Sequence, residues 1–242
     1  MSLRLFEWEA PGPYRVAFST RLGGVSEGSY ASLNLGLRTS DEPQRVIENR
    51  DRLCRAVEAD PQTATMATQV HGARVVAAEP RGIVTRGVAY ERCDGIWSKQ
   101  PRQAMILLTA DCLPIVLCRT DGDPAVAVLH VGWRGLLGGI VAAGARAVGG
   151  RGLAASVGPG ICGRCYRVGD DVATAFAERF GPAVVRDGSL DLRAAAERAL
   201  REAGVEAVEH VDRCTACEPR LFFSHRRDRG VTGRQAVIAY VA

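Results

Sequence analysis

Short apolar segments that alternate with amphipathic ones constrain the fold of this chain more than any other feature of its sequence. The apolar segments are rich in Val, Ile and Ala and are bounded by Gly, Pro or charged residues, which is typical of buried β-strands. We expect strands at Tyr14–Phe18, Ala73–Ala78, Met105–Thr109, Pro114–Cys118, Ala125–Val131, Ala154–Val157, Ala183–Val185 and Ala236–Val241.

Four further segments have the periodicity of helices. Three of them repeat apolar residues at the spacing of one helix face, and the fourth is apolar on nearly all sides, which predicts a buried helix. In chain order they are a segment from Ser40 that aligns Val46, Leu53 and Val57, the apolar Leu136–Val148, then Gly169–Phe180, and a segment with Leu192, Ala196 and Leu200.

This mixture of strands and helices predicts an α/β (α+β) fold, because sheets with apolar faces must be covered by helices or by a second sheet. The 242 residues are enough to bury a substantial core, and we expect a single domain over residues 1–242. The order of the strands cannot be read from the sequence.

The charge and hydropathy of the chain exclude some classes of partner. A net charge of +4, from 31 basic and 27 acidic residues, is too small to imply nucleic acid. The N-terminal segment lacks the apolar stretch of a signal peptide. The apolar run Met105–Cys118 is interrupted by Asp111 and Pro114, so we expect no membrane span. We therefore expect a cytoplasmic monomer or homodimer whose eight cysteines are reduced.

His71, Cys112 and His130 each lie at the end of a predicted strand, beside a tight turn. Strand ends in α/β proteins are common places for functional sites, because a rigid sheet positions the loops. Imidazole and thiolate are preferred zinc ligands, and three protein ligands leave a fourth position for water or substrate. These residues are therefore a candidate catalytic zinc site. The alternative is a structural histidine and a buried free cysteine.

Two of these residues also allow an interpretation without a metal ion. Cys112 could act as a nucleophile with His130 as its base, in a thiol hydrolase or a deamidase. Asp111 or Gln69 would then orient the histidine.

Two arginines in glycine-rich segments are candidates for anion binding. Arg134 lies in Gly-Trp-Arg-Gly directly after His130, and Arg21 precedes Gly23 and Gly24. Guanidinium groups make bidentate contacts with phosphate or carboxylate. The alternative is an arginine that only pins its loop. No phosphate-binding loop or dinucleotide motif occurs in the sequence.

Two Cys-x-x-Cys pairs have the spacing of zinc knuckles. They are Cys162 with Cys165, and Cys214 with Cys217. The separation between the pairs exceeds that of a usual zinc ribbon, so we expect thiols rather than a second, structural zinc. The sequence does not show whether the two pairs meet in space.

Many short motifs follow one another in an order that resembles one known family. They are Thr20-Arg-Leu-Gly-Gly-Val-Ser-Glu-Gly, Ser32-Leu-Asn-Leu-Gly, Glu48-Asn-Arg, Thr68-Gln-Val-His-Gly, Ala110-Asp-Cys-Leu-Pro, His130-Val-Gly-Trp-Arg-Gly, Gly158-Pro-Gly-Ile, Cys165-Tyr, Phe222-Phe-Ser and Thr232-Gly-Arg-Gln. The chain resembles the YfiH-type family, also called the multicopper polyphenol oxidase or laccase-like family.

The resemblance implies a layered α/β/β/α domain with mixed sheets, similar to the catalytic domain of cytotoxic necrotizing factor toxins. It implies zinc on His71, Cys112 and His130, which would also be the catalytic residues. The implied reactions are phosphorolysis of adenosine, inosine, guanosine and methylthioadenosine, and deamination of adenosine. As contacts for nucleoside or phosphate we assign Arg21, Asn34, Gln69 and Arg134.

Three alternatives stay open. The first is a cysteine or zinc amidohydrolase that acts on peptidoglycan precursors. The second is a polyphenol oxidase with copper, an alternative metal for the same ligands. The four histidines of the chain cannot build the several copper centres of a multicopper oxidase. The third is a zinc-stabilised binding protein without turnover.

Overall fold

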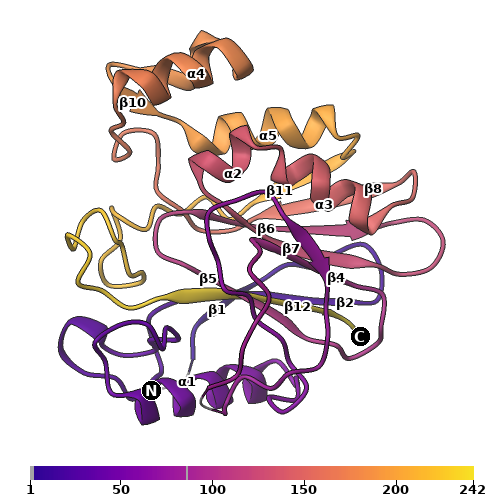
Figure 1. Ribbon diagram of the computed structural model, residues 1–242, viewed down its shortest axis with the longest axis vertical. Helices are drawn as coiled ribbons and strands as arrows, with labels where there is room; N and C mark the ends of the chain where they lie inside the picture. Colours follow the sequence, from indigo (N-terminus) through magenta and orange to yellow (C-terminus); the bar gives the residue numbers. More distant parts are fainter. Residues whose placement is uncertain (1–2, 86) are drawn as a thin grey trace.

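The computed structural model describes residues 3–85 and 87–242, and it confirms an α/β fold in which two sheets lie face to face (Figure 1). The four-stranded sheet has the order β1 (Leu5–Glu7), β2 (Tyr14–Ser19), β12 (Gln235–Val241), β5 (Met105–Thr109). The six-stranded sheet has the order β11 (Ala207–His210), β8 (Leu153–Val157), β6 (Leu113–Arg119), β7 (Val126–Val131), β4 (Gly95–Ser98), β3 (Val75–Ala77).

Helices cover the outer face of each sheet. Helix α1 (Pro43–Ala56) lies on the four-stranded sheet, and the other four helices lie on the side of the six-stranded sheet (Figure 1). These are α2 (Trp133–Leu137), α3 (Ile140–Val148), α4 (Asp170–Phe180) and α5 (Leu192–Glu202). Short elements complete the chain: η1 (Gly28–Tyr30), η2 (Pro182–Val184), and the ribbon of β9 (Val185–Arg186) and β10 (Ser189–Leu190).

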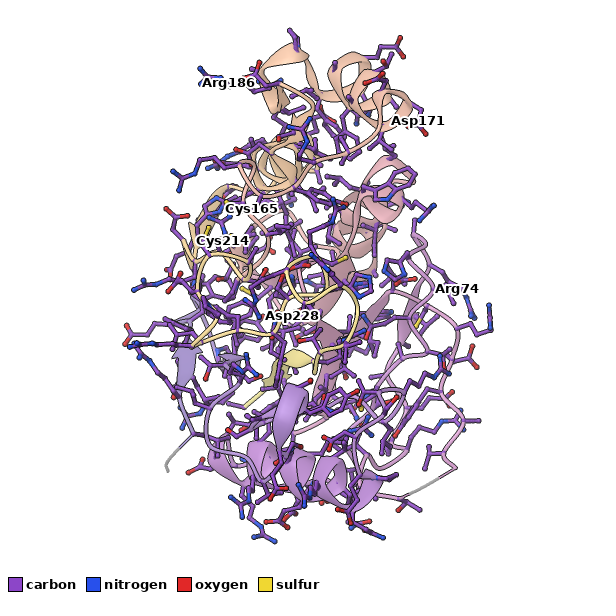
Figure 2. The ribbon with its side chains drawn as sticks, turned by 90° about the vertical axis from the view of Figure 1, so that its left-hand side faces the viewer. Arg74, Cys165, Asp171, Arg186, Cys214 and Asp228 are labelled. Atoms are coloured by element: carbon purple, nitrogen blue, oxygen red, sulfur yellow. The ribbon has the colours of Figure 1, made fainter. Side chains whose placement is uncertain are left out.

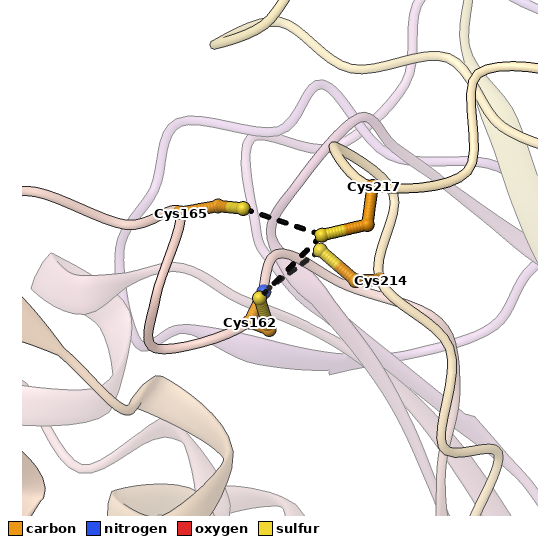
Figure 3. Close-up of side chains that lie close together, drawn as sticks. All are labelled: Cys162, Cys165, Cys214 and Cys217. Atoms are coloured by element: carbon orange, nitrogen blue, oxygen red, sulfur yellow. Dashed lines mark hydrogen bonds between the residues drawn. The ribbon is translucent and has the colours of Figure 1, made fainter.

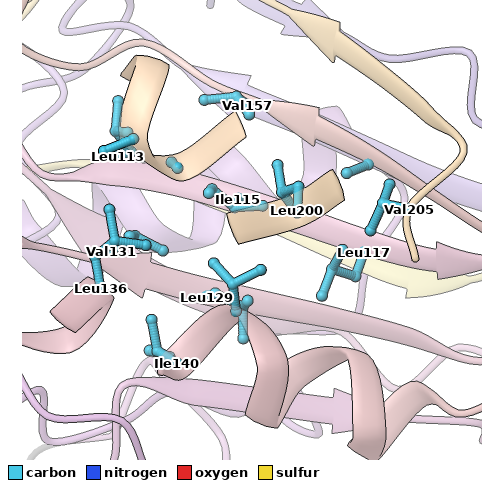
Figure 4. Close-up of a cluster of buried hydrophobic side chains, with 14 of the residues drawn as sticks. Leu113, Ile115, Leu117, Leu129, Val131, Leu136, Ile140, Val157, Leu200 and Val205 are labelled. Atoms are coloured by element: carbon cyan, nitrogen blue, oxygen red, sulfur yellow. The ribbon is translucent and has the colours of Figure 1, made fainter. Parts of the chain in front are cut away.

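Three apolar cores separate the four layers, as expected for an α/β/β/α arrangement. One lies between the six-stranded sheet and its helices, and it includes Leu117, Leu129 and Leu200 (Figure 4). The second lies between the sheets, and the third lies beneath α1. Strand β7 contributes to two of them, because Val128 faces the other sheet while Leu129 faces the helices. Burial on both faces explains why every residue of this strand except His130 is apolar, rather than every second residue.

Two of the predicted elements are wrong. Leu136–Val148 is not one helix, since Gly139 has a φ of 84° and separates α2 from α3. Most of Ala183–Val185 is not a strand, because Gly181, with a φ of 82°, and Pro182 begin a 3-10 turn there. The strands β1, β4 and β11 were not predicted; they are short, and their sequences are not strongly apolar.

In the described part of the chain, no helix has the length and apolar character needed to span a membrane. The domain boundaries at 1 and 242 stay a prediction.

Candidate active site

The structure brings His71, Cys112 and His130 together at one end of the six-stranded sheet. Cys112 immediately precedes β6, and His130 lies in β7, opposite Pro114 of β6 in the antiparallel register. His71 comes from the loop before β3. One ligand atom from each of the three residues lies within 4.8 Å of the others. His130 is buried, Cys112 is partly buried and His71 is exposed, so the group opens to solvent on one side.

The buried carboxylate of Asp94 makes hydrogen bonds that hold both His71 and His130 in place. Its oxygens accept hydrogen bonds from the backbone N–H groups of Val70, His71 and Gly72, at 3.1, 2.9 and 2.7 Å. Its Oδ1 also lies 2.8 Å from Nδ1 of His130. The hydrogen bond to Nδ1 leaves Nε2 as the free ring nitrogen of His130, which is the arrangement common for metal-ligating histidines.

The local electrostatics favour charge on both Cys112 and His130. Burial raises the pKa of the Cys112 thiol, but His130 and His71 outweigh burial and lower this pKa to about 6. Burial lowers the pKa of His130, but Cys112 and Asp94 outweigh it and raise the pKa to about 9. Burial also raises the pKa of Asp94, yet its hydrogen bonds with His130 and Gly72 hold this pKa below its ordinary value. A thiolate beside an imidazolium follows for the protein without metal.

The backbone beside the three residues lies close to their side chains. A Cβ on Gly132 would lie 3.1 Å from Sγ of Cys112 and 3.3 Å from Cδ2 of His71. Asp111 has a φ of 96°, and its carboxylate accepts hydrogen bonds from the Thr215 hydroxyl and the Arg226 N–H, both at 2.7 Å. The turn that presents Cys112 is therefore held from several sides.

The donor set fits a metal such as zinc. Two imidazoles and one thiolate are soft or borderline ligands, and three protein ligands with one open side match a catalytic zinc site. The buried Asp94 supplies the outer hydrogen bond that such histidines usually make.

The two arginines predicted to bind anions lie in different surroundings from each other. Arg134 is exposed at the start of α2, and its guanidinium lies 4.2 Å from the centre of the Trp133 ring. Arg21 donates to the carbonyl oxygens of Ala31 and Pro219 and lines an open groove of about 990 Å³. His71, Cys112 and His130 are not among the residues that line this groove.

Asn34 and Gln69 are engaged with the protein itself. The buried Asn34 amide donates to Thr39 and Asp41, and its oxygen accepts from the backbone N–H of Gly36 and Arg234. The Gln69 amide makes two hydrogen bonds with the backbone of Leu108, at 2.7 and 2.9 Å, which fixes the loop before His71. Contacts of these two side chains with a substrate stay a prediction.

Sequence reasoning missed four residues near the site. Asp94 had no motif to mark it. Tyr166, Arg226 and Arg234 belong to or follow segments that carry the family resemblance, which was a usable signal. Burial and the charge of Cys112 raise the pKa of Tyr166 to about 12, and the Arg226 guanidinium lies 5.3 Å from the Tyr166 ring centre. Burial lowers the pKa of Arg234, while Asp111 and Cys112 raise it.

The structure also shows that the two cysteine pairs meet. Cys165 and Cys214 lie side by side on the face shown in Figure 2, and the sulfur atoms of all four cysteines lie within 4.8 Å of one another.

Comparison with known proteins identifies the family. The family model described as multi-copper polyphenol oxidoreductase laccase matches residues 15–242. The chain belongs to this family, known also as the YfiH family. It is 36% identical to a purine nucleoside phosphorylase of Pseudomonas aeruginosa, over 97% of this chain and 96% of the relative. It is 37% identical to the purine nucleoside phosphorylase YfiH of Escherichia coli, over 95% of each chain.

A solved family structure has the same fold. The Neisseria meningitidis protein superposes with a TM-score of 0.87 at 34% identity, covering 100% of this chain and 99% of that one. Similarity to the necrotizing factor toxins stays a prediction.

Proposed function

We propose that this protein is a zinc-dependent purine nucleoside phosphorylase, with adenosine, inosine, guanosine and methylthioadenosine as substrates, that also deaminates adenosine. One observation supports this proposal most strongly: His71, Cys112 and His130 form a three-ligand group with an open side, backed by the buried Asp94. The relatives named purine nucleoside phosphorylases support the reaction class.

Zinc held by His71, Cys112 and His130 would supply Lewis-acid chemistry at its open coordination position. The protein's own residues would do the rest. Asp94 holds the His130 ring in one orientation, and Arg134 offers a guanidinium to the negative charge of phosphate. Arg21, Asn34 and Gln69 are further candidate contacts for nucleoside or phosphate.

Phosphorolysis breaks the bond between the purine nitrogen and C1′ and forms a bond between C1′ and a phosphate oxygen. The departing base takes up a proton, and the products are the free base and ribose 1-phosphate. Deamination instead consumes water and releases inosine and ammonia from adenosine.

A product assay tests the proposal. Protein of known zinc content is incubated with adenosine, with and without phosphate, and the products are separated by chromatography. Adenine and ribose 1-phosphate that form only with phosphate would support the phosphorylase. Inosine that forms without phosphate would support the deaminase activity.

Two variants make this assay specific. Cys112→Ala should abolish turnover, because it removes a metal ligand. Cys54→Ala is the matched control, since Cys54 is a buried thiol in the core beneath α1. Adenosine that survives unchanged with stoichiometric zinc, or a Cys112→Ala variant with normal kinetics, would refute the proposal.

The paired charges of Cys112 and His130 support a second candidate, a cysteine or zinc amidohydrolase that acts on peptidoglycan precursors. Release of amino acids from such precursors by zinc-free protein, with no reaction of nucleosides, would favour the thiol mechanism. Polyphenol oxidation is less well supported, because a chain with four histidines cannot hold several copper centres. We also propose a cytoplasmic location and a monomeric or homodimeric state.

A further inference from the structure

Four cysteines outside the candidate active site converge because two strands run side by side. Strands β8 and β11 pair in parallel, with Val157 opposite His210, so both end at the same edge of the sheet. The loop after β8 carries Cys162 and Cys165, and the loop after β11 carries Cys214 and Cys217 (Figure 3).

The two loops are joined by backbone contacts beside the cysteines. Gly160 and Cys214 form a parallel β-bridge, and the Thr215 N–H donates to the Gly160 carbonyl at 3.1 Å. The Cys162 N–H donates to Sγ of Cys214 at 3.2 Å (Figure 3). Backbone N–H groups that point at cysteine sulfur stabilise thiolates, which are the form that binds metal.

The spacing of the sulfur atoms agrees with a metal site rather than with disulfides. Sγ of Cys217 lies 3.4 Å from Sγ of Cys165 and 4.0 Å from Sγ of Cys162. Four sulfurs placed about 2.3 Å from one zinc ion at tetrahedral angles would be about 3.8 Å apart. Sulfur atoms joined in a disulfide would be about 2.05 Å apart.

We propose that Cys162, Cys165, Cys214 and Cys217 bind one structural zinc ion through four thiolates. Two Cys-x-x-Cys pairs with no place left for water are the ligand set of a closed, structural site. This site is separate from the His71–Cys112–His130 group and does not depend on the proposed function.

The bound ion would stabilise the turn that presents Cys112. The neighbours of the cysteines contact Asp111 directly: the Ile161 N–H donates to its carbonyl at 2.9 Å, and the Thr215 hydroxyl donates to its carboxylate at 2.7 Å. Fixing the two loops therefore fixes the residue before Cys112.

Zinc content per chain tests the proposal. In the His71→Ala–Cys112→Ala variant, which lacks two ligands of the other site, we expect one zinc ion to remain per chain. In the Cys165→Ala–Cys217→Ala variant we expect the content to fall by one ion and the melting temperature to fall. Cys54→Ala, a control at a buried thiol elsewhere, should leave the zinc content unchanged.

A spectroscopic measurement leaves all four cysteines in place, so its result does not depend on whether the Cys165→Ala–Cys217→Ala variant folds. X-ray absorption at the zinc edge of the His71→Ala–Cys112→Ala variant should show four sulfur ligands at about 2.3 Å. The proposal is overturned if this variant holds no zinc, if it holds iron instead, or if intact-mass measurement shows two disulfides among the four cysteines. Neither measurement uses a nucleoside. Failure of the structural-zinc proposal is therefore distinguishable from failure of the phosphorylase proposal.

Discussion

Cys112 carries the clearest chemical signature of any single residue in the site. Its thiol pKa, near 9 in the unperturbed group, is lowered to about 6 by His130 and His71 against the effect of burial. A lowered pKa means that the reactive thiolate is already present at neutral pH. In metal-free protein we therefore expect the rate of Cys112 alkylation by iodoacetamide to rise with pH around a midpoint near 6. Peptide mass spectrometry measures this rate.

Two comparisons sharpen this prediction. Zinc should protect Cys112, because a coordinated thiolate is a poorer nucleophile. Replacing His130 by Asn removes the partner charge and should move the midpoint toward 9. A midpoint near 9 in the unmodified chain would contradict the pairing of the two groups.

Asp94 is a second residue whose substitution should change the site, because it holds the His130 ring and the backbone of the loop that carries His71. The substitution Asp94→Asn puts an amide N–H₂ group where one carboxylate oxygen accepts hydrogen bonds, and it removes the charge that faces His130. We expect zinc affinity at the triad to fall about 10- to 100-fold, as for other lost outer-shell partners. Competition with a chromophoric chelator measures this change, and an unchanged affinity would show that Asp94 does not support the ligands.

At the scale of elements, Gly139 separates helix α2 from helix α3. Gly139 has a φ of 84°, and a Cβ at this position would contact nothing within 4 Å. The substitution Gly139→Ala should therefore cost about 1 kcal/mol of unfolding free energy through backbone strain alone.

Gly139→Asn is the matched comparison, because Asn tolerates the left-handed region better than Ala. Urea unfolding should rank wild type, Asn and Ala in order of decreasing stability. Equal stability of the Ala variant and the wild type would contradict a strain cost for Ala at this position.

At the scale of the whole molecule, stability depends on the core between the six-stranded sheet and its helices. Leu117 in β6 is fully buried there. Leu117→Ala should cost about 3 kcal/mol, through lost burial and the cavity left behind. Val231 is 59% exposed, and Val231→Ala should change stability by less than about 0.5 kcal/mol. Denaturant unfolding measures both, and similar losses would contradict the layered core.

The sequence by itself determined the local features of this protein. Burial on both faces makes β6 and β7 apolar apart from Arg119 and His130, so these strands could be predicted without a structure. The residue types of His71, Cys112 and His130 define the donor atoms, their positions at strand ends made them a candidate site, and the family resemblance implied that they share one metal. Half-polar strands such as β11 were not predicted, because their sequence pattern resembles that of loops.

Only the tertiary structure decided which distant residues meet. Apolar periodicity is a local property and does not encode strand order, so nothing in the sequence places Asp94 behind His130. The two Cys-x-x-Cys pairs meet because β8 and β11 are parallel neighbours in one sheet. That adjacency results from packing the whole chain into four layers, which is why the separation of the pairs along the sequence was a poor guide to their distance in space.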